Sequence, residues 1–277
     1  MIAILMSTYN GERFLREQLD SILSQTYTAW QLYVRDDGST DATVSILREY
    51  ATAHPERVII DLSEGKPLGA CGSFMHLLAQ HGDADYFAFA DQDDVWLPNK
   101  LEVSLAAMEQ AEREHPNIPI VVHSDLQVVD EQLQPMHPSF WRYSNIRPDL
   151  VDQNRYYLAI SNTVTGCAML MNRAARAASL PFPSSAYMHD AWIALQTLLS
   201  GGIVCPIGEA TILYRQHGTN VLGAVHYSLF GRTIRSHIED ARLCYRMGHP
   251  MVYKNKAHFL LWKVTYWCHR FFTSAKS

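Results

Sequence analysis

The chain has 277 residues, 48% hydrophobic and 18% charged, which is enough for one large α/β domain or a slightly smaller domain with an appendage. Its five cysteines are odd in number, scattered and never spaced Cys-x-x-Cys, which argues against a disulfide framework or zinc ribbon and for a reducing compartment. No basic segment precedes the apolar N-terminus, and no stretch reaches the roughly 18–20 apolar residues that span a bilayer. We therefore expect a cytoplasmic protein.

The net charge of −5 is unevenly distributed. Residues 226–277 hold nine Lys and Arg side chains against Glu239 and Asp240, a local charge of +7, so residues 1–225 carry −12. The same C-terminal segment is rich in aromatic residues. We place a boundary here, between a domain of residues 1–225 and a basic, aromatic, helical extension of residues 226–277.

In the first half of the chain, short apolar runs alternate with segments of helical periodicity. Each of three predicted strands ends in a polar cluster. Ser39 or Thr40 is expected to cap the second helix. The predicted strands are Ile2–Met6, Gln31–Arg35, Val58–Leu62 and Tyr86–Ala90, and the predicted helices are Glu12–Gln25, a segment around residues 44–47, residues 70–80, and Leu97–Glu114. This alternation predicts a mostly parallel, doubly wound α/β sheet.

The second half is less regular. The pattern favours strands at Ile120–His123, Cys167–Met171 and Ile212–Tyr214, and a helix at Ala191–Ser200. No internal repeat is present in the sequence.

The polar clusters that follow the strands are the first candidates for a binding site, because ligands of open α/β sheets bind at the carboxyl ends of strands. They are Ser7-Thr8-Tyr9-Asn10, Asp36-Asp37-Gly38-Ser39 and Asp91-Gln92-Asp93-Asp94. The second cluster alone is equally well explained as a turn. The third places three carboxylates within four residues, an arrangement suited to Mg²⁺ or Mn²⁺ shared with phosphate oxygens, with a solvated turn as the alternative.

The ordered set of motifs resembles the inverting family 2 glycosyltransferases. The motifs are Met6-Ser7-Thr8-Tyr9-Asn10-Gly11, Ser24-Gln25-Thr26, Asp36-Asp37-Gly38-Ser39-Thr40-Asp41 and Asp91-Gln92-Asp93-Asp94-Val95-Trp96-Leu97-Pro98. The resemblance covers about residues 1–222 and implies the A-type glycosyltransferase fold. It also implies that Ser7, Tyr9 and Asp37 surround the nucleoside, that Asp91 faces the ribose, and that Asp93 binds the metal.

Asp190 lies in Tyr187-Met188-His189-Asp190-Ala191-Trp192, directly before a predicted helix. Taken alone it is also an ordinary helix N-cap. The resemblance implies that an acidic residue here is the general base that deprotonates the acceptor hydroxyl, so we assign that role to Asp190. Relatives often carry an acidic pair at this turn, and His189 replaces one member of the pair.

His217 and Arg215 follow the last predicted strand, in Tyr214-Arg215-Gln216-His217-Gly218-Thr219-Asn220. His217 is either an ordinary core or surface histidine or a further metal ligand, and Arg215 is a candidate contact to the diphosphate. The resemblance favours the ligand role for His217. Together with the acidic turn, this motif is similar to the rhamnosyltransferase-like branch, which implies dTDP-L-rhamnose as the donor and a cell-surface polysaccharide such as an O-antigen, or a lipid-linked oligosaccharide, as the acceptor.

The basic, aromatic segment 226–277 has two explanations. Ala257–Phe272 is apolar but interrupted by Lys263, His269 and Arg270, a pattern that suits a helix in the headgroup region of an anionic membrane leaflet. The other explanation is a helical hairpin packed on the domain or on another subunit. A nucleic-acid role is disfavoured, because the acidic body opposes it.

The sequence therefore predicts an inverting, metal-dependent glycosyltransferase at the inner face of the cell membrane. Two rivals remain: a nucleotidyltransferase and a catalytically silent sugar-nucleotide-binding subunit. A nucleotidyltransferase would want a basic, Gly-rich phosphate loop after the first strand, and Ser7–Gly11 has no basic residue. Transfer of another donor, such as a UDP-hexose, is a third alternative.

Overall fold

The computed structural model describes residues 1–61, 66–183, 186–218 and 234–274, and within them the strands form one sheet of nine. The path of the sheet is β3-β2-β1-β4-β8-β6-β9-β5, with β7 paired to β6. The strands are β1 Ile2–Thr8, β2 Trp30–Asp36, β3 Val58–Asp61, β4 Tyr86–Ala90, β5 Val95–Trp96, β6 Ile120–Val129, β7 Pro135–His137, β8 Met169–Asn172 and β9 Ile203–Arg215.

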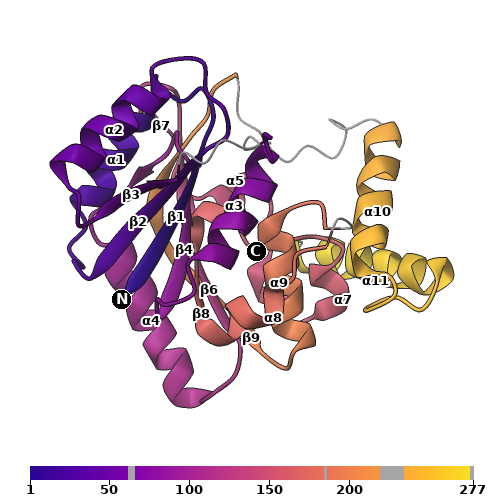
Figure 1. Cartoon of the computed structure of the whole chain (residues 1–277). Helices are drawn as coiled ribbons and strands as arrows, with labels where there is room; N and C mark the ends of the chain where they lie inside the picture. Colours follow the sequence, from indigo (N-terminus) through magenta and orange to yellow (C-terminus); the bar gives the residue numbers. More distant parts are fainter. Residues whose placement is uncertain (62–65, 184–185, 219–233, 275–277) are drawn as a thin grey trace.

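Helices cover both faces of this sheet (Figure 1). The longer ones are α1 Leu15–Leu23, α2 Thr43–Ala53, α3 Gly69–Gln80, α4 Lys100–Glu114, α8 Arg173–Ser179, α9 His189–Leu199, α10 Ile234–Gly248 and α11 Lys256–Ser274. Single turns connect β7 to β8: α5 Phe140–Tyr143, α6 Pro148–Val151, α7 Arg155–Leu158 and the 3₁₀ helix η1 Gly166–Ala168.

Strand β1 shows why the sequence folds into three layers. Its residues alternate between the two faces of the sheet, and both faces are buried, so nearly every position is apolar. Ile2, Ile4 and Met6 pack with α1, α2 and α4, whereas Ala3 and Leu5 pack with α3, α8 and α9.

The predicted α/β class is confirmed. Strands β3, β2, β1 and β4 are mutually parallel, as the alternation of strands and helices predicts. Beyond β4 the sheet is mixed: β8 runs antiparallel to both β4 and β6, and β5 runs antiparallel to β9. The change follows from the connections, because the short turns between β7 and β8 do not form the crossover helix that a parallel strand needs.

Two local expectations are corrected. Helix α2 begins at Thr43 without a side-chain cap from Ser39 or Thr40. The Ser39 hydroxyl instead donates to Asp36 within the turn after β2, and the Thr40 amide donates to Asn10, which joins this turn to the loop after β1. The last strand extends over Ile203–Arg215 rather than Ile212–Tyr214, because pairing with β6 carries it across Pro206 and Gly208.

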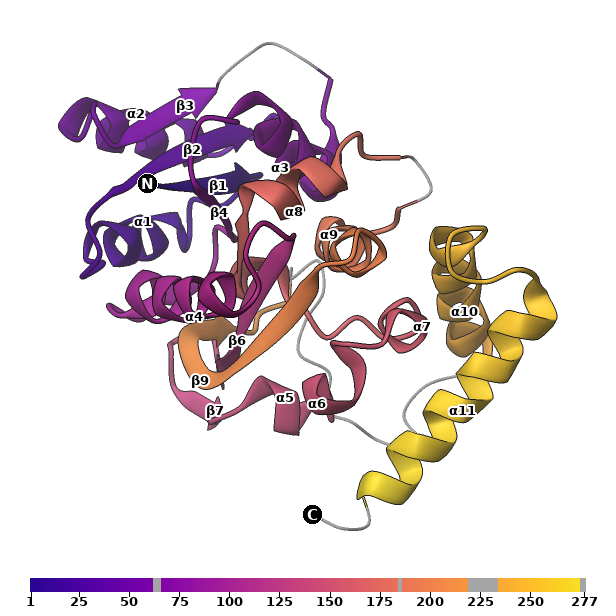
Figure 2. The same ribbon diagram turned by 90° about the horizontal axis from the view of Figure 1, so that it is seen from below.

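Helices α10 and α11 lie side by side at the end of the molecule remote from β3 (Figure 2). Met247 of α10, Phe259 of α11 and Tyr253 of the connection between them form a small core with Trp192 and Leu195 of α9. The predicted boundary at residue 225 lies outside the described residues. Within the described part of the chain, no helix is long and apolar enough to cross a membrane.

Candidate active site

The polar clusters predicted from the sequence meet at one edge of the sheet. Strand β1 pairs with β2 on one side and with β4 on the other, all in parallel, with Ser7 beside Arg35 and Met6 beside Ala90. The residues that follow each strand therefore emerge together. Ser7, Tyr9, Asp37 and Asp91 lie along this edge.

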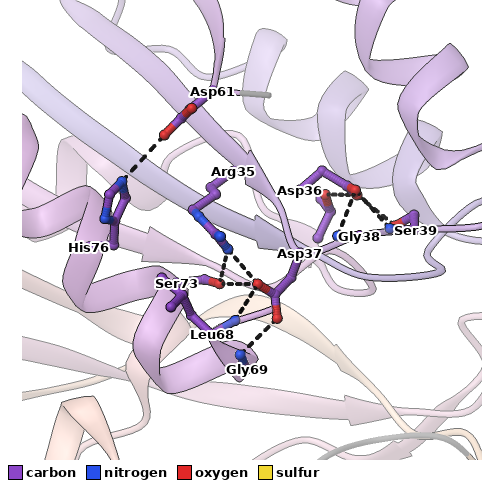
Figure 3. Close-up of polar contacts among 11 residues, drawn as sticks. Arg35, Asp36, Asp37, Gly38, Ser39, Asp61, Leu68, Gly69, Ser73 and His76 are labelled. Atoms are coloured by element: carbon purple, nitrogen blue, oxygen red, sulfur yellow. Dashed lines mark hydrogen bonds and ion pairs between the residues drawn. The ribbon is translucent and has the colours of Figure 1, made fainter. Parts of the chain in front are cut away.

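The turn after β2 is organised by two carboxylates that protein donors satisfy (Figure 3). Asp37 is buried and accepts hydrogen bonds from the backbone amides of Leu68 and Gly69 at 2.8 and 2.7 Å. The Arg35 guanidinium and the Ser73 hydroxyl also donate to it. Burial alone would raise the pKa of Asp37, but these donors outweigh burial and hold it below its ordinary value. Asp37 is therefore a fixed anion.

Tyr9 differs from Asp37 in its exposure. Its side chain is 57% exposed, so the ring presents a face to solvent at the sheet edge. Its backbone is fixed, because the Gln92 side chain accepts from the Tyr9 amide and donates to the Tyr9 carbonyl, both at 2.9 Å. The loop after β1 and the acidic turn after β4 are thus joined. A side chain at Gly11 would collide with the Gln92 amide and displace it from these two hydrogen bonds.

In the turn after β4, half-buried Asp91 and buried Asp94 have too few protein donors to stabilise their charge. Burial, with the charge of Asp93, raises the pKa of Asp91 to about 7. The pKa of Asp94 lies well above its ordinary value for the same reasons. Asp94 is fully buried, and its Oδ2 has no hydrogen-bond partner within the described residues. One oxygen of Asp91, one oxygen of Asp94 and the Cys167 sulfur all lie within 4.8 Å of one another.

The segment after β9 returns to this turn. His217 Nε2 lies 2.8 Å from Asp93 Oδ2, and the His217 ring packs on Phe14 with centroids 4.8 Å apart. The pair offers a carboxylate oxygen and an imidazole nitrogen at one point, and both are ordinary ligands of a divalent cation. The residues present therefore fit the metal that the acidic turn predicts.

Arg215 lies beneath this pair and is only 1% exposed. Its guanidinium donates to the carbonyls of Asp93 and Glu131 and pairs with Glu17, and its amide donates to Asp94 at 3.1 Å. Arg215 thus fixes the end of β9 to the acidic turn. The sequence-based expectation that it also contacts a diphosphate stays a prediction.

Asp190 approaches the same region from the opposite half of the chain. It lies in the first turn of α9, is buried, and accepts from the Gly166 amide at 3.1 Å and from the Ala191 amide at 2.6 Å. Burial raises the pKa of Asp190 to about 6, although these two amides oppose the rise. The Gly166 amide that donates to Asp190 precedes Cys167, whose sulfur lies within 4.8 Å of oxygens of Asp91 and Asp94, so Asp190 lies near the acidic turn.

Residues 3–177 match the sequence pattern described as Glycosyl transferase family 2. The match covers the three polar strand ends and most of the sheet. The chain belongs to family 2.

Two relatives align with part of this family 2 chain. Putative glycosyltransferase EpsE of Bacillus subtilis (strain 168) is 40% identical over 110 residues, which are 39% of this chain and 38% of the relative. The dTDP-rhamnosyl transferase RfbG of Shigella flexneri is 37% identical over 99 residues, 35% of this chain and 34% of the relative. The chain thus aligns with less than half the length of either relative.

Two solved structures share the fold. S. aureus TarS (residues 1–349) in complex with UDP-GlcNAc superposes with a TM-score of 0.62 at 17% identity, over 89% of this chain and 66% of that one. The mannosyltransferase PcManGT from Pyrobaculum calidifontis, in complex with GDP-Man and Mn²⁺, superposes with a TM-score of 0.57 at 18% identity, over 80% and 58% of the two chains. At such identities the likeness is one of fold.

Sequence reasoning missed three residues of this family 2 site. Gly166 supplies an amide to Asp190, Cys167 lies against Asp91 and Asp94, and Lys100 is fully buried with its ammonium 4.0 Å above the Trp96 ring. The sequence pattern predicts that Cys167 begins a strand, but Gly166–Ala168 form the 3₁₀ helix η1 and the strand begins at Met169. Neither Gly166 nor Cys167 belongs to a motif that marks it as a site residue. Lys100 follows the acidic motif by six residues, and only the burial of that helix face brings it inward.

Proposed function

We propose that the chain is an inverting glycosyltransferase that moves a sugar from a nucleoside-diphosphate sugar to a hydroxyl acceptor. The observation that carries this proposal is the approach of Asp190 on α9 to the acidic turn after β4. Asp93 and His217 form a pair that can hold a metal and its diphosphate. The buried Asp190 carboxylate approaches the same edge of the sheet from α9. Family membership supports the reaction class.

The nucleoside is proposed to bind over the ends of β1 and β2. The exposed ring of Tyr9 offers a stacking face, and the fixed carboxylate of Asp37 offers an acceptor for a pyrimidine N3–H. Asp37 Oδ2 accepts only the Gly69 amide within the described residues, whereas Oδ1 accepts three donors. Oδ2 is therefore the atom we assign to the base. Ser7 borders the same position, and Asp91 is assigned to the ribose.

Asp93 and His217 are proposed to hold Mg²⁺ or Mn²⁺ together with the diphosphate oxygens. When bound, the cation would stabilise the charge that develops on the departing diphosphate. The contribution of the chain is to hold the two ligands at the same point. Arg215 does so by tying the end of β9 to the turn, since it contacts Asp93 and Asp94 by separate hydrogen bonds.

Asp190 is proposed to remove the proton of the acceptor hydroxyl. With a pKa near 6 it is ionised at neutral pH, yet basic enough to accept a proton as the hydroxyl attacks the sugar. Attack from the side opposite the diphosphate inverts the anomeric configuration. Asp190 is the second residue of α9 rather than its N-cap, which is Met188. The Gly166 amide, from outside the helix, and the Ala191 amide orient its carboxylate.

For the donor we propose dTDP-L-rhamnose, on the similarity to RfbG and on the motifs after β4 and β9. A UDP-hexose is the alternative, supported by the fold shared with TarS in its UDP-GlcNAc complex. The acceptor we propose is a cell-surface polysaccharide, such as an O-antigen, or a lipid-linked oligosaccharide.

The outer face of α11 is proposed to contact an anionic membrane surface, where a lipid-linked acceptor would be presented. Four large apolar side chains are 48–63% exposed on one side of the helix: Leu260, Leu261, Val264 and Trp267. Phe259 and Tyr266, on the other side, are buried against the domain. Lys254, Lys256 and Lys263 flank the apolar stripe, and residues 250–274 contain no acidic residue. A basic, apolar helix face of this kind binds anionic lipid headgroups.

The experiment that tests the reaction is release of nucleoside diphosphate from a panel of dTDP-, UDP- and GDP-sugars with Mn²⁺, with Mg²⁺ and in EDTA. We expect one sugar nucleotide to be preferred and turnover to require the cation. If each sugar nucleotide binds but none is turned over, with acceptor extracts or without them, the chain is instead a sugar-nucleotide-binding subunit.

A further inference from the structure

His189, the neighbour of the proposed base, is an unusual buried histidine. It is 4% exposed, and neither ring nitrogen has a hydrogen-bond partner within the described residues. The ring is held by two aromatic neighbours instead: Phe74 of α3, with centroids 4.6 Å apart, and Phe89 of β4, edge-on at 4.8 Å. Burial lowers the pKa of His189 to about 3, so the ring is neutral at physiological pH.

The edge of this ring presses against Gly166. A β-carbon built on Gly166 would lie 2.6 Å from His189 Nε2 and 3.0 Å from its Cε1, and 3.7 Å from Asp190 Oδ2. The His189 ring and the Asp190 carboxylate therefore converge on one side of Gly166. The Gly166 amide is also a hydrogen-bond donor to Asp190 Oδ2. The position of the carboxylate thus depends on a backbone that the histidine ring holds in place.

The unpaired nitrogens make a purely structural role costly. A buried polar group without a partner destabilises a protein by about 1–3 kcal/mol, and a carbon side chain of similar size would pack between Phe74 and Phe89 without that cost. The ring adds no charge near Asp190, because it is neutral. The ring occupies the space between Phe74, Phe89 and Gly166, next to the Asp190 carboxylate.

We propose that His189 is a positioning residue for the general base: wedged between Phe74 and Phe89, it fixes the Gly166 amide and keeps Asp190 oriented and dry. This inference rests on the proposed role of Asp190. The other ionisable groups near Asp190 are Cys71 of α3, Tyr187 before α9 and Asp91 after β4. The charge of Asp190 contributes to the raised pKa of each. The Cys71 and Tyr187 groups are neutral near pH 7, because burial raises the pKa of both.

The first test is the pH profile of His189→Ala. In the wild type, kcat falls as the pH drops through about 6, since Asp190 must be ionised to accept a proton. Water that enters the space of the missing ring should move this acid limb down by about one to two pH units, toward the ordinary aspartate value of about 4. We expect kcat at pH 8 to fall about 10- to 100-fold, with the donor KM changed less than about twofold. His115→Ala, a change of an exposed histidine after α4, is the control.

The second test uses the close contact between Gly166 and the ring. Gly166→Ala should lower kcat about tenfold or more, because the new methyl group collides with His189. The double variant Gly166→Ala/His189→Ala removes the collision, so we expect it to be no less active than His189→Ala alone. If the loss of kcat in the double variant equals the product of the losses in the two single variants, the proposal is overturned, because the residues then act independently.

Asp190→Ala, assayed alongside, separates this inference from the proposed function. If Asp190→Ala is inactive while His189→Ala keeps the wild-type acid limb, His189 is only a packing residue and the function stands. If Asp190→Ala retains turnover, the base assignment itself fails. Thermal melting and binding of the donor nucleotide show that each variant is folded. Should His189→Ala not fold, Gly166→Ala alone decides the matter, because an unchanged kcat in that variant would overturn the proposal.

Discussion

The two halves of the active-site edge treat their carboxylates in opposite ways. After β2, Asp37 is surrounded by donors and its pKa is lowered. After β4 and at the start of α9, half-buried Asp91 and buried Asp190 have few donors, and their pKa values rise to about 7 and about 6. The protein itself supplies the donors that stabilise the Asp37 charge, so Asp37 contributes a fixed acceptor. Asp91 and Asp190 lack such a set of donors, and a cation or a proton from a substrate would neutralise their charge.

Between Asp37 and Asp190, this difference matches the binding role proposed for the first and the reacting role proposed for the second. A carboxylate with a lowered pKa is a poor base but a dependable hydrogen-bond acceptor, as a nucleoside site requires. A carboxylate with a pKa near neutrality exchanges protons at little cost. The variants below test the division, from the largest expected effect to the smallest.

Asp190→Ala should have the largest effect. Loss of a general base lowers kcat by about 10²–10⁴-fold. Binding of the donor nucleotide should stay within about threefold of wild type, since we place Asp190 on the acceptor side. Single-turnover transfer and calorimetric binding measure the two quantities. Asp83→Asn, a change of an exposed carboxylate before β4, is the matched control. Parallel loss of turnover and nucleotide binding would place Asp190 in the donor site instead.

Leu261→Asp tests whether the outer face of α11 binds a membrane surface. The Leu261 side chain is 63% exposed, so the change should not disturb the fold. The variant loses one leucine that would be buried in the membrane surface and gains a negative charge. Both changes should weaken binding to vesicles of anionic phospholipid, together about tenfold or more. Vesicle flotation measures this, and turnover with a water-soluble acceptor should not change. Met136→Asp, at an apolar position on β7 that is 52% exposed, is the control. If both variants lose vesicle binding equally, or if neither loses it, α11 contacts another partner, such as a second copy of the chain.

Asp37→Asn should affect stability more than the chemical step. Loss of the charged acceptor weakens the hydrogen bonds from Arg35, Leu68 and Gly69, at a cost of about 1–3 kcal/mol. Because the pKa of Asp37 is lowered in the folded state, its charge stabilises the protein above the ordinary aspartate pKa of about 4, and this contribution disappears as the pH falls through the lowered value. The difference in melting temperature between Asp37→Asn and wild type should thus be large at pH 7 and shrink toward pH 3. A constant difference would contradict this account.

The sequence predicted the donor side of this edge better than the acceptor side. Strands β1, β2 and β4 are local apolar runs followed at once by their polar residues, so both the element and the site residue are visible in one short window. Asp190 was found through a motif. Its setting was not, because Phe74, Phe89, Gly166 and His189 come from four separate elements and meet only through packing. Arg215 illustrates the same limit. The motif marks it as functional, but only the fold shows its guanidinium buried against Glu17.

Binding of a nucleoside diphosphate, measured with and without Mn²⁺, tests the central claim most directly. In wild type, dTDP or UDP should bind at least about tenfold more tightly with Mn²⁺ than in EDTA, and the bound Mn²⁺ should be detectable by its paramagnetic relaxation of water protons. In Asp93→Ala the cation should no longer strengthen nucleotide binding, because we assign Asp93 and His217 as its ligands. Nucleotide binding of equal strength in Mn²⁺ and in EDTA would contradict the account.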